Sequence, residues 1–169
     1  FPCGGTLIGA IRHNGFVPWD HDVDVALLAA DWHDTDIARL VDAGFDAEPR
    51  RWTRQWMIDM LAPGAEGQAS FVKCTLADGI HADLRIFWPG VDGAHYSPMW
   101  DGTVWRLPAE LVEPLVPHQF AGRWAVSVPE RAADHLAYVY GDWETPRPDW
   151  HGTAEYQEYS KKALEARTK

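Results

Sequence analysis

Residues 18–25, Pro-Trp-Asp-His-Asp-Val-Asp-Val, begin the strand that decides the fold. Successive side chains of a strand point to opposite faces, so we expect Asp20, Asp22 and Asp24 on one face and the valines on the other. Aspartate is a poor strand former, and three of them in alternation before an aliphatic run need a physical reason. Two interpretations compete at this point: a functional site, or an exposed edge of an acidic protein.

Residues 80–86, Ile-His-Ala-Asp-Leu-Arg-Ile, carry a second alternating pattern. His81, Asp83 and Arg85 share one face of this predicted strand, and the apolar residues between them share the other. If this strand lies beside the first one, Asp83 joins the aspartates of that strand on a single face of a sheet.

The charge on such a face limits what it can be. Like charges about 4 Å apart near a protein surface repel by roughly 4 kcal/mol for each pair. Repulsion among Asp22, Asp24 and Asp83 then approaches the whole stability of a domain, so the cluster must take up protons or bind a cation. Hard carboxylate oxygens on rigid strands favour Mg²⁺ or Mn²⁺, which bridge to substrate phosphates.

The rest of the pattern predicts one α+β domain, a mixed sheet flanked by helices, over all 169 residues. Hairpins alternate irregularly with helices, which favours this class over a doubly wound sheet of repeated βαβ units. The predicted helices span residues 6–14, 32–43 and 129–140, and residues 153–169 form a polar helical tail. The predicted strands and hairpins span residues 23–28, 70–76 with 80–87, 96–107 with a turn at Asp101-Gly102, and 120–128 with a turn at Ala121-Gly122.

Composition excludes several classes of function. The net charge of −10 argues against nucleic-acid binding and against docking on anionic lipid. The two cysteines, Cys3 and Cys74, lack the spacing of a disulfide framework or a structural zinc site. No apolar run approaches the roughly 20 residues of a membrane span, and no signal peptide is present, so we expect a soluble domain without membrane insertion. The localisation stays open, with the cytoplasm favoured if the protein is bacterial, and the sequence carries no indication of the oligomeric state.

Residues 4–27, GGTLIGAIRHNGFVPWDHDVDVAL, resemble the signature of the LicD family. This family includes bacterial phosphocholine transferases and fukutin-related ribitol-phosphate transferases, and it belongs to the nucleotidyltransferase-fold superfamily. Residues 81–84, 115–120 and 140–146 also resemble the family, so the resemblance covers nearly the whole chain. The chain departs from the pattern at His21, where the family often has an aspartate. Because the family usually has a strand or helix before the glycine motif, we expect this sequence to lack its N-terminal element.

The resemblance implies a nucleotidyltransferase-like fold and a metal-dependent transferase. Phosphocholine or an alditol phosphate would pass from a CDP-linked donor to a glycan hydroxyl, and CMP would leave. Asp22 and Asp24 would hold Mg²⁺ or Mn²⁺ against the donor diphosphate, and Asp83 would complete a second metal site or accept the proton of the attacking hydroxyl. The helix that begins at Gly5 and Thr6 would present backbone N–H groups to phosphate oxygens.

Other side chains are candidates for substrate binding, each with an ordinary alternative. Arg12 and Lys73 suit phosphate binding, but a solvent-facing helix arginine and a surface lysine are common. Arg85 is either a phosphate ligand or the ion-pair partner of Asp83, and His81 either lines the site or lies on the surface. The 10 tryptophans suit sugar stacking or a core, and large aromatic residues are more often core, which we expect for Trp100, Trp105 and Trp124.

Two other functions remain open. One keeps the fold and the metal but moves NMP from an NTP and releases pyrophosphate. The other is a non-catalytic, Trp-rich glycan-binding domain, against which the clustered acids argue, because a domain that only binds has no use for them. The nucleotide that is consumed separates the two enzymes, and glycan affinity without divalent-metal dependence would favour the binding domain.

Overall fold

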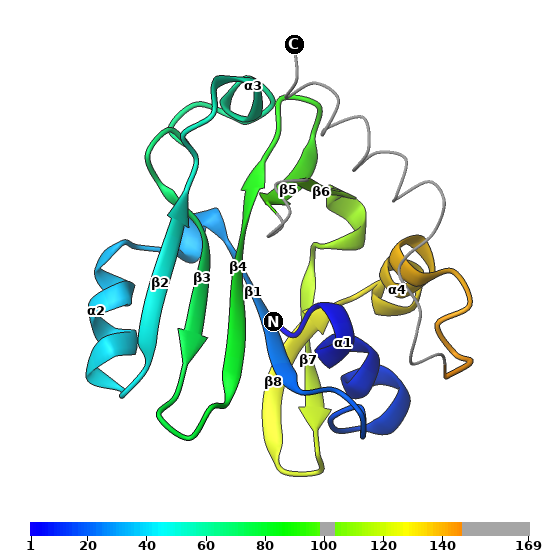
Figure 1. The fold of residues 1–169 in the computed structure, drawn as a ribbon. Coiled ribbons are helices and arrows are strands. Elements are labelled where there is room, and N and C mark those ends of the chain that lie inside the picture. Colours follow the sequence, from blue (N-terminus) through cyan, green and yellow to red (C-terminus); the bar gives the residue numbers. More distant parts are fainter. Residues whose placement is uncertain (99–103, 147–169) are drawn as a thin grey trace.

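The computed structural model of the chain describes residues 1–98 and 104–146 (Figure 1). A six-stranded sheet and a separate hairpin form its framework. The sheet contains β1 (Asp22–Leu28), β2 (Asp46–Arg51), β3 (Ala69–Thr75), β4 (His81–Pro89), β5 (Ala94–Pro98) and β6 (Val104–Pro108), and the hairpin contains β7 (Leu115–Phe120) and β8 (Trp124–Pro129). The helical segments are α1 (Gly4–Ile8), η1 (Gly9–His13), η2 (Ala29–Asp31), α2 (Thr35–Asp42), α3 (Gln55–Ile58), η3 (Ala109–Leu111) and α4 (Ala132–Tyr140).

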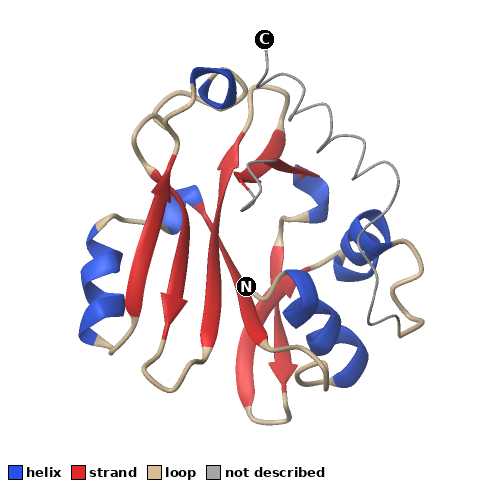
Figure 2. Cartoon of the chain, viewed as in Figure 1, coloured by secondary structure: helices blue, strands red, loops and turns tan. Residues whose placement is uncertain are grey.

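The sheet is mixed, as the sequence predicts, but mostly antiparallel. Strands follow the order β2-β3-β4-β5-β6 with antiparallel pairing throughout, and β1 pairs with β4 in parallel. Figure 2 shows these strands with few helices around them. The α+β class is therefore confirmed, and the β1–β4 pairing is the one that brings the two acidic strands together.

One face of the sheet packs against α2. Val72, Cys74 and Ile86 form a buried core on this face, and Ile37 and Leu40 of α2 pack against it. The helix predicted over residues 32–43 is shorter in the structure, where α2 begins at Thr35.

The opposite face carries a second core and, beside it, the acidic residues. Ala26 of β1 and Phe87 of β4 are fully buried there with Cys3, Trp105 and Val139. Asp24 precedes Ala26 and Arg85 precedes Phe87 on the same face, at the margin of this core.

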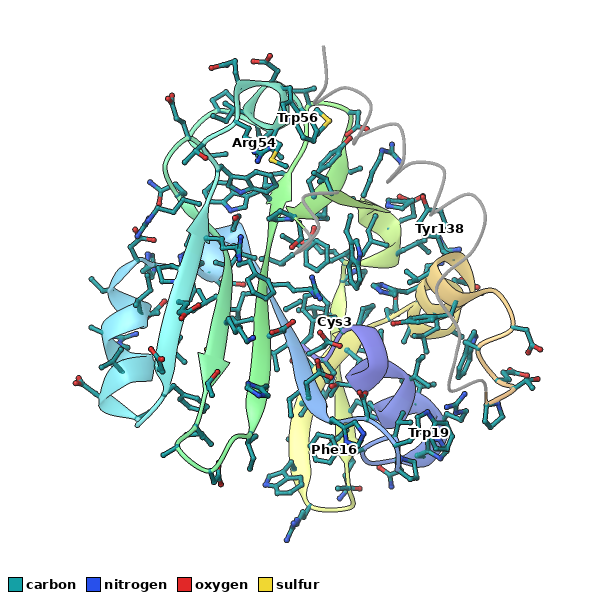
Figure 3. All side chains as sticks on the ribbon, in the orientation of Figure 1. Cys3, Phe16, Trp19, Arg54, Trp56 and Tyr138 are labelled. Atoms are coloured by element: carbon teal, nitrogen blue, oxygen red, sulfur yellow. The ribbon has the colours of Figure 1, made fainter. Side chains whose placement is uncertain are left out.

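The first residues of the chain fix α1 against β1. Pro2 forms an antiparallel bridge with Val25, and the backbone N–H of Cys3 donates to the carbonyl oxygen of Asp24 at 3.1 Å. The hydroxyl of Thr6 then accepts a hydrogen bond from the backbone N–H of Asp24 at 2.9 Å. Figure 3 labels Cys3 at the junction of α1 and β1.

The predicted first helix is present, but it changes from α-helical to π-helical along its length. After α1 the chain continues as the π-helical turn η1, which ends where Asn14 adopts the left-handed conformation with φ 50°. Gly9 lies against the loop that follows, because a Cβ placed on it would overlap the carbonyl oxygen of Gly15 and lie 3.1 Å from the backbone nitrogen of Val17. The close approach of this loop holds the segment before β1 in place.

Some expectations are wrong and others fall outside the described residues. β2 and α3 were not predicted, because β2 is a polar edge strand that contains Pro49 and so lacks the alternation of a half-buried strand. Pro129 ends β8 instead of beginning the last helix, which starts three residues later at Ala132. Trp105 is buried as expected, but Trp124 is 45% exposed. The Asp101-Gly102 turn, Trp100 and the tail over residues 153–169 lie outside the described part of the chain.

None of the described helices is long and apolar enough to cross a membrane.

The contact between Gly9 and Gly15 predicts an unusual effect of Gly9→Ala. An alanine normally stabilises a helix by about 1 kcal/mol relative to glycine. Here the added methyl group overlaps the Gly15 carbonyl, so we expect Gly9→Ala to lower the free energy of unfolding by about 1–3 kcal/mol. Urea denaturation measures the change, and Ala38→Gly at an exposed position of α2 reports the ordinary helix preference. An unchanged or more stable Gly9→Ala protein contradicts the packing described for this loop.

Candidate active site

The acidic residues of β1 and β4 lie side by side. The parallel register places Asp24 opposite Asp83 and Asp22 opposite His81. On the other side of β4, Lys73 of β3 lies opposite Asp83. Residues that lie opposite each other in a register share a face, so the predicted grouping of Asp22, Asp24 and Asp83 on one face is confirmed.

Arg85 is the buried counter-ion of this acidic face. Its guanidinium lies 3.5 Å from Oδ1 of Asp24 and 3.9 Å from Oδ2 of Asp83. The same group lies over the ring of Trp105, at 4.3 Å from the ring centroid. Arg85 is 5% exposed, so it holds the two carboxylates from beneath, as the ion-pair interpretation of this residue requires.

The arginine does not balance all of the negative charge. Burial raises the pKa of Asp24 to about 6; Arg85 opposes the shift, and the charges of Asp22, Asp83 and Asp20 add to it. Burial also raises the pKa of Asp20, assisted by hydrogen bonding to Asp22. Asp24 and Asp20 therefore hold protons more tightly than an ordinary aspartate does in the absence of another cation.

The donor set suits a hard divalent cation, although the carboxylates are not gathered around a common point. Within residues 1–98 and 104–146, no three His, Cys, Asp or Glu side chains converge closely enough to hold a metal ion. Nearly buried carboxylate oxygens with unbalanced charge are nevertheless the ligands that Mg²⁺ and Mn²⁺ prefer. Gly4 and Gly5 make room for them, because a Cβ on either glycine would overlap the carboxyl group of Asp24 or Asp20, respectively.

Two cavities adjoin this face. The first, here called the acidic cavity, has a volume of about 480 Å³ and is lined by Trp19, Asp20, His21, Asp22, Lys73, His81 and Asp83. The second, here called the aromatic cavity, has a volume of about 300 Å³ and is lined by Gly5, Ile8, Arg12, Val17, Trp19, Asp20, Tyr140, Asp142, Trp143 and Thr145. Trp19 and Asp20 line both cavities, so they form a shared wall; Figure 3 labels Trp19 beside α1 and η1.

The predicted substrate-binding residues divide between these places. Lys73 and His81 line the acidic cavity with Asp22 and Asp83, and Nδ1 of His81 lies 3.2 Å from the hydroxyl of Thr75. Gly5 and Arg12 line the aromatic cavity, where Nη1 of Arg12 donates to the carbonyl oxygen of Trp143 at 2.5 Å. The remaining two candidates line neither cavity: the Thr6 hydroxyl is bonded to the backbone of Asp24, and Arg85 lies beneath the acids.

Several residues of the cavities were not predicted as site residues. Asp20 belongs to the same alternation as Asp22, and this alternation was the signal that could have identified it. It was not among the predicted site residues, and in the structure it precedes β1. Strict alternation from Asp20 to Asp24 would turn His21 away from the acids, but His21 precedes β1 and lines the acidic cavity. Tyr140 and Asp142 come from a segment that resembles the family, and only the fold brings that segment against α1.

The raised pKa of Asp24 predicts a pH-dependent stability. The folded protein binds this proton more tightly than the unfolded chain, in which the pKa of the aspartate has its ordinary value of 3.8. The proton on Asp24 therefore contributes to the free energy of unfolding below about pH 4. This contribution is lost as the pH rises through about 6, and the free energy of unfolding falls by about 3 kcal/mol in total. We expect Asp24→Asn to stabilise the metal-free protein at neutral pH and to flatten this pH dependence.

Urea denaturation in a chelating buffer between about pH 4.5 and 7.5 tests this expectation. Asp42→Asn, at the exposed end of α2, is the matched control because it leaves the acidic face intact. If Asp24→Asn keeps the wild-type pH dependence of stability, the pKa of Asp24 is not raised in the folded protein.

The buried position of Arg85 predicts a large effect of Arg85→Met. Removing one partner of a buried ion pair leaves uncompensated charge, so we expect a loss of about 3–5 kcal/mol at neutral pH. The loss is smaller when Arg85→Met is combined with Asp24→Asn, because one of the two carboxylates is then neutral. Arg39→Met is the control, since Arg39 pairs with Asp36 on the surface and such pairs contribute at most about 1 kcal/mol. Equal losses for Arg39→Met and Arg85→Met would show that Arg85 does not hold the acidic face.

Most of the chain is similar in sequence to known transferases. Residues 1–131 match the family described as LicD/FKTN/FKRP, nucleotidyltransferase domain. The ribitol 5-phosphate transferase FKRP of Homo sapiens is 27% identical over 153 residues, which cover 89% of this chain and 29% of that protein. The ribitol 5-phosphate transferase FKRP of Mus musculus is 28% identical over 153 residues, which again cover 89% of this chain and 29% of that protein. The lipopolysaccharide cholinephosphotransferase LicD of Haemophilus influenzae is 39% identical over 104 residues, which cover 51% of this chain and 37% of that protein.

These relatives are longer proteins, of which the chain covers 29% to 37%. The family match nevertheless extends over both acidic strands, the glycine segment of α1, and the residues that line the acidic cavity. The chain belongs to the LicD/FKTN/FKRP family of nucleotidyltransferase domains.

Proposed function

We propose that this chain transfers a phospho-alcohol group from a CDP-linked donor to a glycan hydroxyl, on a nucleotidyltransferase-like fold and with Mg²⁺ or Mn²⁺. The observation that supports this most directly is the register of β1 and β4, which places Asp24 opposite Asp83, a residue that lines the acidic cavity. Ribitol-phosphate and choline-phosphate transfer, the activities in the names of the relatives, are reactions of this type.

Asp22, Asp24 and Asp83 are the residues that would hold the cation. When bound, it neutralises the diphosphate of the donor and makes the attacked phosphorus more electrophilic. Three carboxylates lie on one face, and a single buried arginine contacts two of them, so the face keeps negative charge that a cation can balance.

Lys73 and Asp83 line the same cavity from neighbouring strands, and each has its own role in the reaction. The ammonium group of Lys73 attracts the phosphates of the donor, and His81 lines the cavity beside it. The carboxylate of Asp83 accepts the proton of the glycan hydroxyl while the hydroxyl oxygen forms its bond to phosphorus. The bond from that phosphorus to the bridging oxygen breaks, and CMP leaves with the electron pair.

Arg85 acts through Asp24 and Asp83 and does not touch the donor. It is nearly fully buried and lines neither cavity, so it is a positioning residue that orients both carboxylates, and its charge opposes the rise in the pKa of Asp24. This role replaces direct phosphate binding, the other role considered for Arg85.

Binding of donors tests the proposal. We expect CDP-choline, CDP-ribitol or CDP-glycerol with Mg²⁺ to stabilise the full chain more than ATP or UTP do. A ligand at a hundredfold excess over its dissociation constant stabilises the folded state by roughly 2.7 kcal/mol, which a thermal shift detects. Equal shifts with all nucleotides would favour transfer of NMP from an NTP, and glycan binding without any metal dependence would favour a binding domain.

Asp83→Asn separates catalysis from structure in the same experiment. We expect CMP release to fall by about 10²–10⁴-fold, because the proton acceptor is lost. The melting temperature without metal stays the same or rises slightly, because the repulsion between Asp83 and its neighbouring carboxylates is removed. A destabilised Asp83→Asn protein with full activity would instead make Asp83 a structural partner of Arg85.

A further inference from the structure

The face of β1 that is opposite the acids is only partly covered. Val23, Val25 and Leu27 alternate with the acids, so they point to the face that packs against α2, but of these three only Leu27 takes part in that core. A cavity of about 310 Å³, here called the apolar groove, lies beside the two valines. Phe16, Val23, Val25, Phe120 and Val126 line it together with Pro2, and the polar residues among those that line it are one threonine and one serine.

A row of aromatic side chains continues from the apolar groove to the end of the β7–β8 hairpin. The rings of Phe16 and Phe120 meet edge to face with their centroids 4.9 Å apart, and the ring of Trp124 lies 6.2 Å from that of Phe120. Phe120 is buried, but Phe16 is 49% exposed and Trp124 is 45% exposed. The backbone N–H of Ala121 donates to the carbonyl oxygen of Asn14 at 2.8 Å, which joins the hairpin to the loop that carries Phe16 (Figure 3). Large apolar side chains exposed side by side mark an interaction surface.

The charge beside this row is opposite in sign to that of the chain. A cavity of about 340 Å³ adjoins the end of the hairpin, and Gln119, Arg123 and Trp124 are among the residues that line it. The chain has 25 acidic residues, yet none of the described residues that line this cavity or the apolar groove is an acid. The guanidinium of Arg123 lies over the ring of Trp124, at 4.0 Å from the ring centroid. A cation therefore lies at the margin of an apolar and aromatic surface, where it suits a phosphate group.

This order of polarity matches the surface of a phospholipid bilayer. Apolar side chains suit the acyl chains, tryptophan favours the boundary between acyl chains and headgroups, and arginine reaches the headgroup phosphates. The net charge of −10 opposes an anionic bilayer, so a zwitterionic lipid suits this chain better. We propose that the surface formed by the apolar groove, Trp124 and Arg123 docks on a zwitterionic phospholipid bilayer, as a peripheral contact within its interface.

Docking by this surface would hold the candidate active site near the lipid. Phe16 and Trp19 are three residues apart, so their backbones lie within about 11 Å of each other. Trp19 lines the acidic cavity with Asp20 and His21. The acidic cavity would therefore open near acceptors that are attached to lipid. The inference goes beyond the proposed function and does not depend on it, because docking needs neither nucleotide nor metal.

Cosedimentation of the full chain with vesicles of phosphatidylcholine, without nucleotide or metal, tests the inference. We expect the chain to bind these vesicles, and to bind vesicles with about 30% phosphatidylglycerol no more tightly, because apolar contacts and not the net charge drive docking. Absence of binding to phosphatidylcholine vesicles, or binding only to those that contain phosphatidylglycerol, overturns the inference.

Three variants locate the contact. Phe16→Ser and Trp124→Ser are each expected to lower the partition coefficient about tenfold, because aromatic area is no longer removed from water. Arg123→Glu, which keeps both aromatic side chains, is expected to lower it at least about threefold by repelling the phosphates. Val91→Ser is the control, since Val91 is 71% exposed on the β4–β5 turn, at the opposite end of the molecule from the hairpin turn (Figure 1). If Val91→Ser weakens binding as much as Trp124→Ser does, or if none of the three variants weakens it, the bilayer contacts another surface and the inference fails.

A second copy of the chain is the other occupant that an apolar surface could have. Light scattering of the chain without vesicles separates the two. A monomer supports docking on lipid, because the surface is then free to meet a bilayer. A dimer that Phe16→Ser dissociates would show that a second copy covers this surface, and it would overturn the inference.

Discussion

The contact of one buried guanidinium with two carboxylates holds the functional half of this molecule together. Arg85 and Asp83 are two residues apart on β4, and Asp24 lies opposite Asp83 on β1. A shift of β1 by one residue would turn Asp24 to the face that packs against α2 and would leave Arg85 without one of its two partners. The ion pairs thus specify the parallel register, and the register in turn brings Asp22 and Asp83 to the same cavity.

The N-terminal residues and α4 depend on that arrangement. Asp24 offers its backbone carbonyl to Cys3 and its backbone N–H to Thr6, so α1 is attached to the strand at the same residue that contacts Arg85. The segment after α4 then joins η1 through Arg12. Two hydrogen bonds thus attach α1 to β1, and a third joins η1 to the segment after α4; these three contacts hold together the walls of the two cavities, which share Trp19 and Asp20.

Much of this could be predicted from alternation alone. The pattern of aspartates before residue 25 and of His81, Asp83 and Arg85 predicted a shared acidic face on the condition that the two strands are neighbours, and the structure supplies that pairing. The polar edge strand β2 could not be predicted in this way, since Pro49 and its charged neighbours follow no apolar period. The aromatic cavity was also beyond prediction, because Tyr140 and Trp143 reach it only after α4 packs against α1. The role of Arg85 needed the structure for another reason: only its burial and its distances to both acids support the counter-ion interpretation.

A titration of the Asp24 carboxyl group is the most direct test of this account. Its carboxyl carbon, observed by NMR in ¹³C-labelled protein without metal, should titrate with a pKa of about 6. Addition of Mg²⁺ should lower that pKa, because a bound cation favours the carboxylate over the neutral acid. A pKa near the ordinary value of 3.8 that Mg²⁺ leaves unchanged would show that burial does not raise the pKa of Asp24 and that the acidic face does not bind the cation.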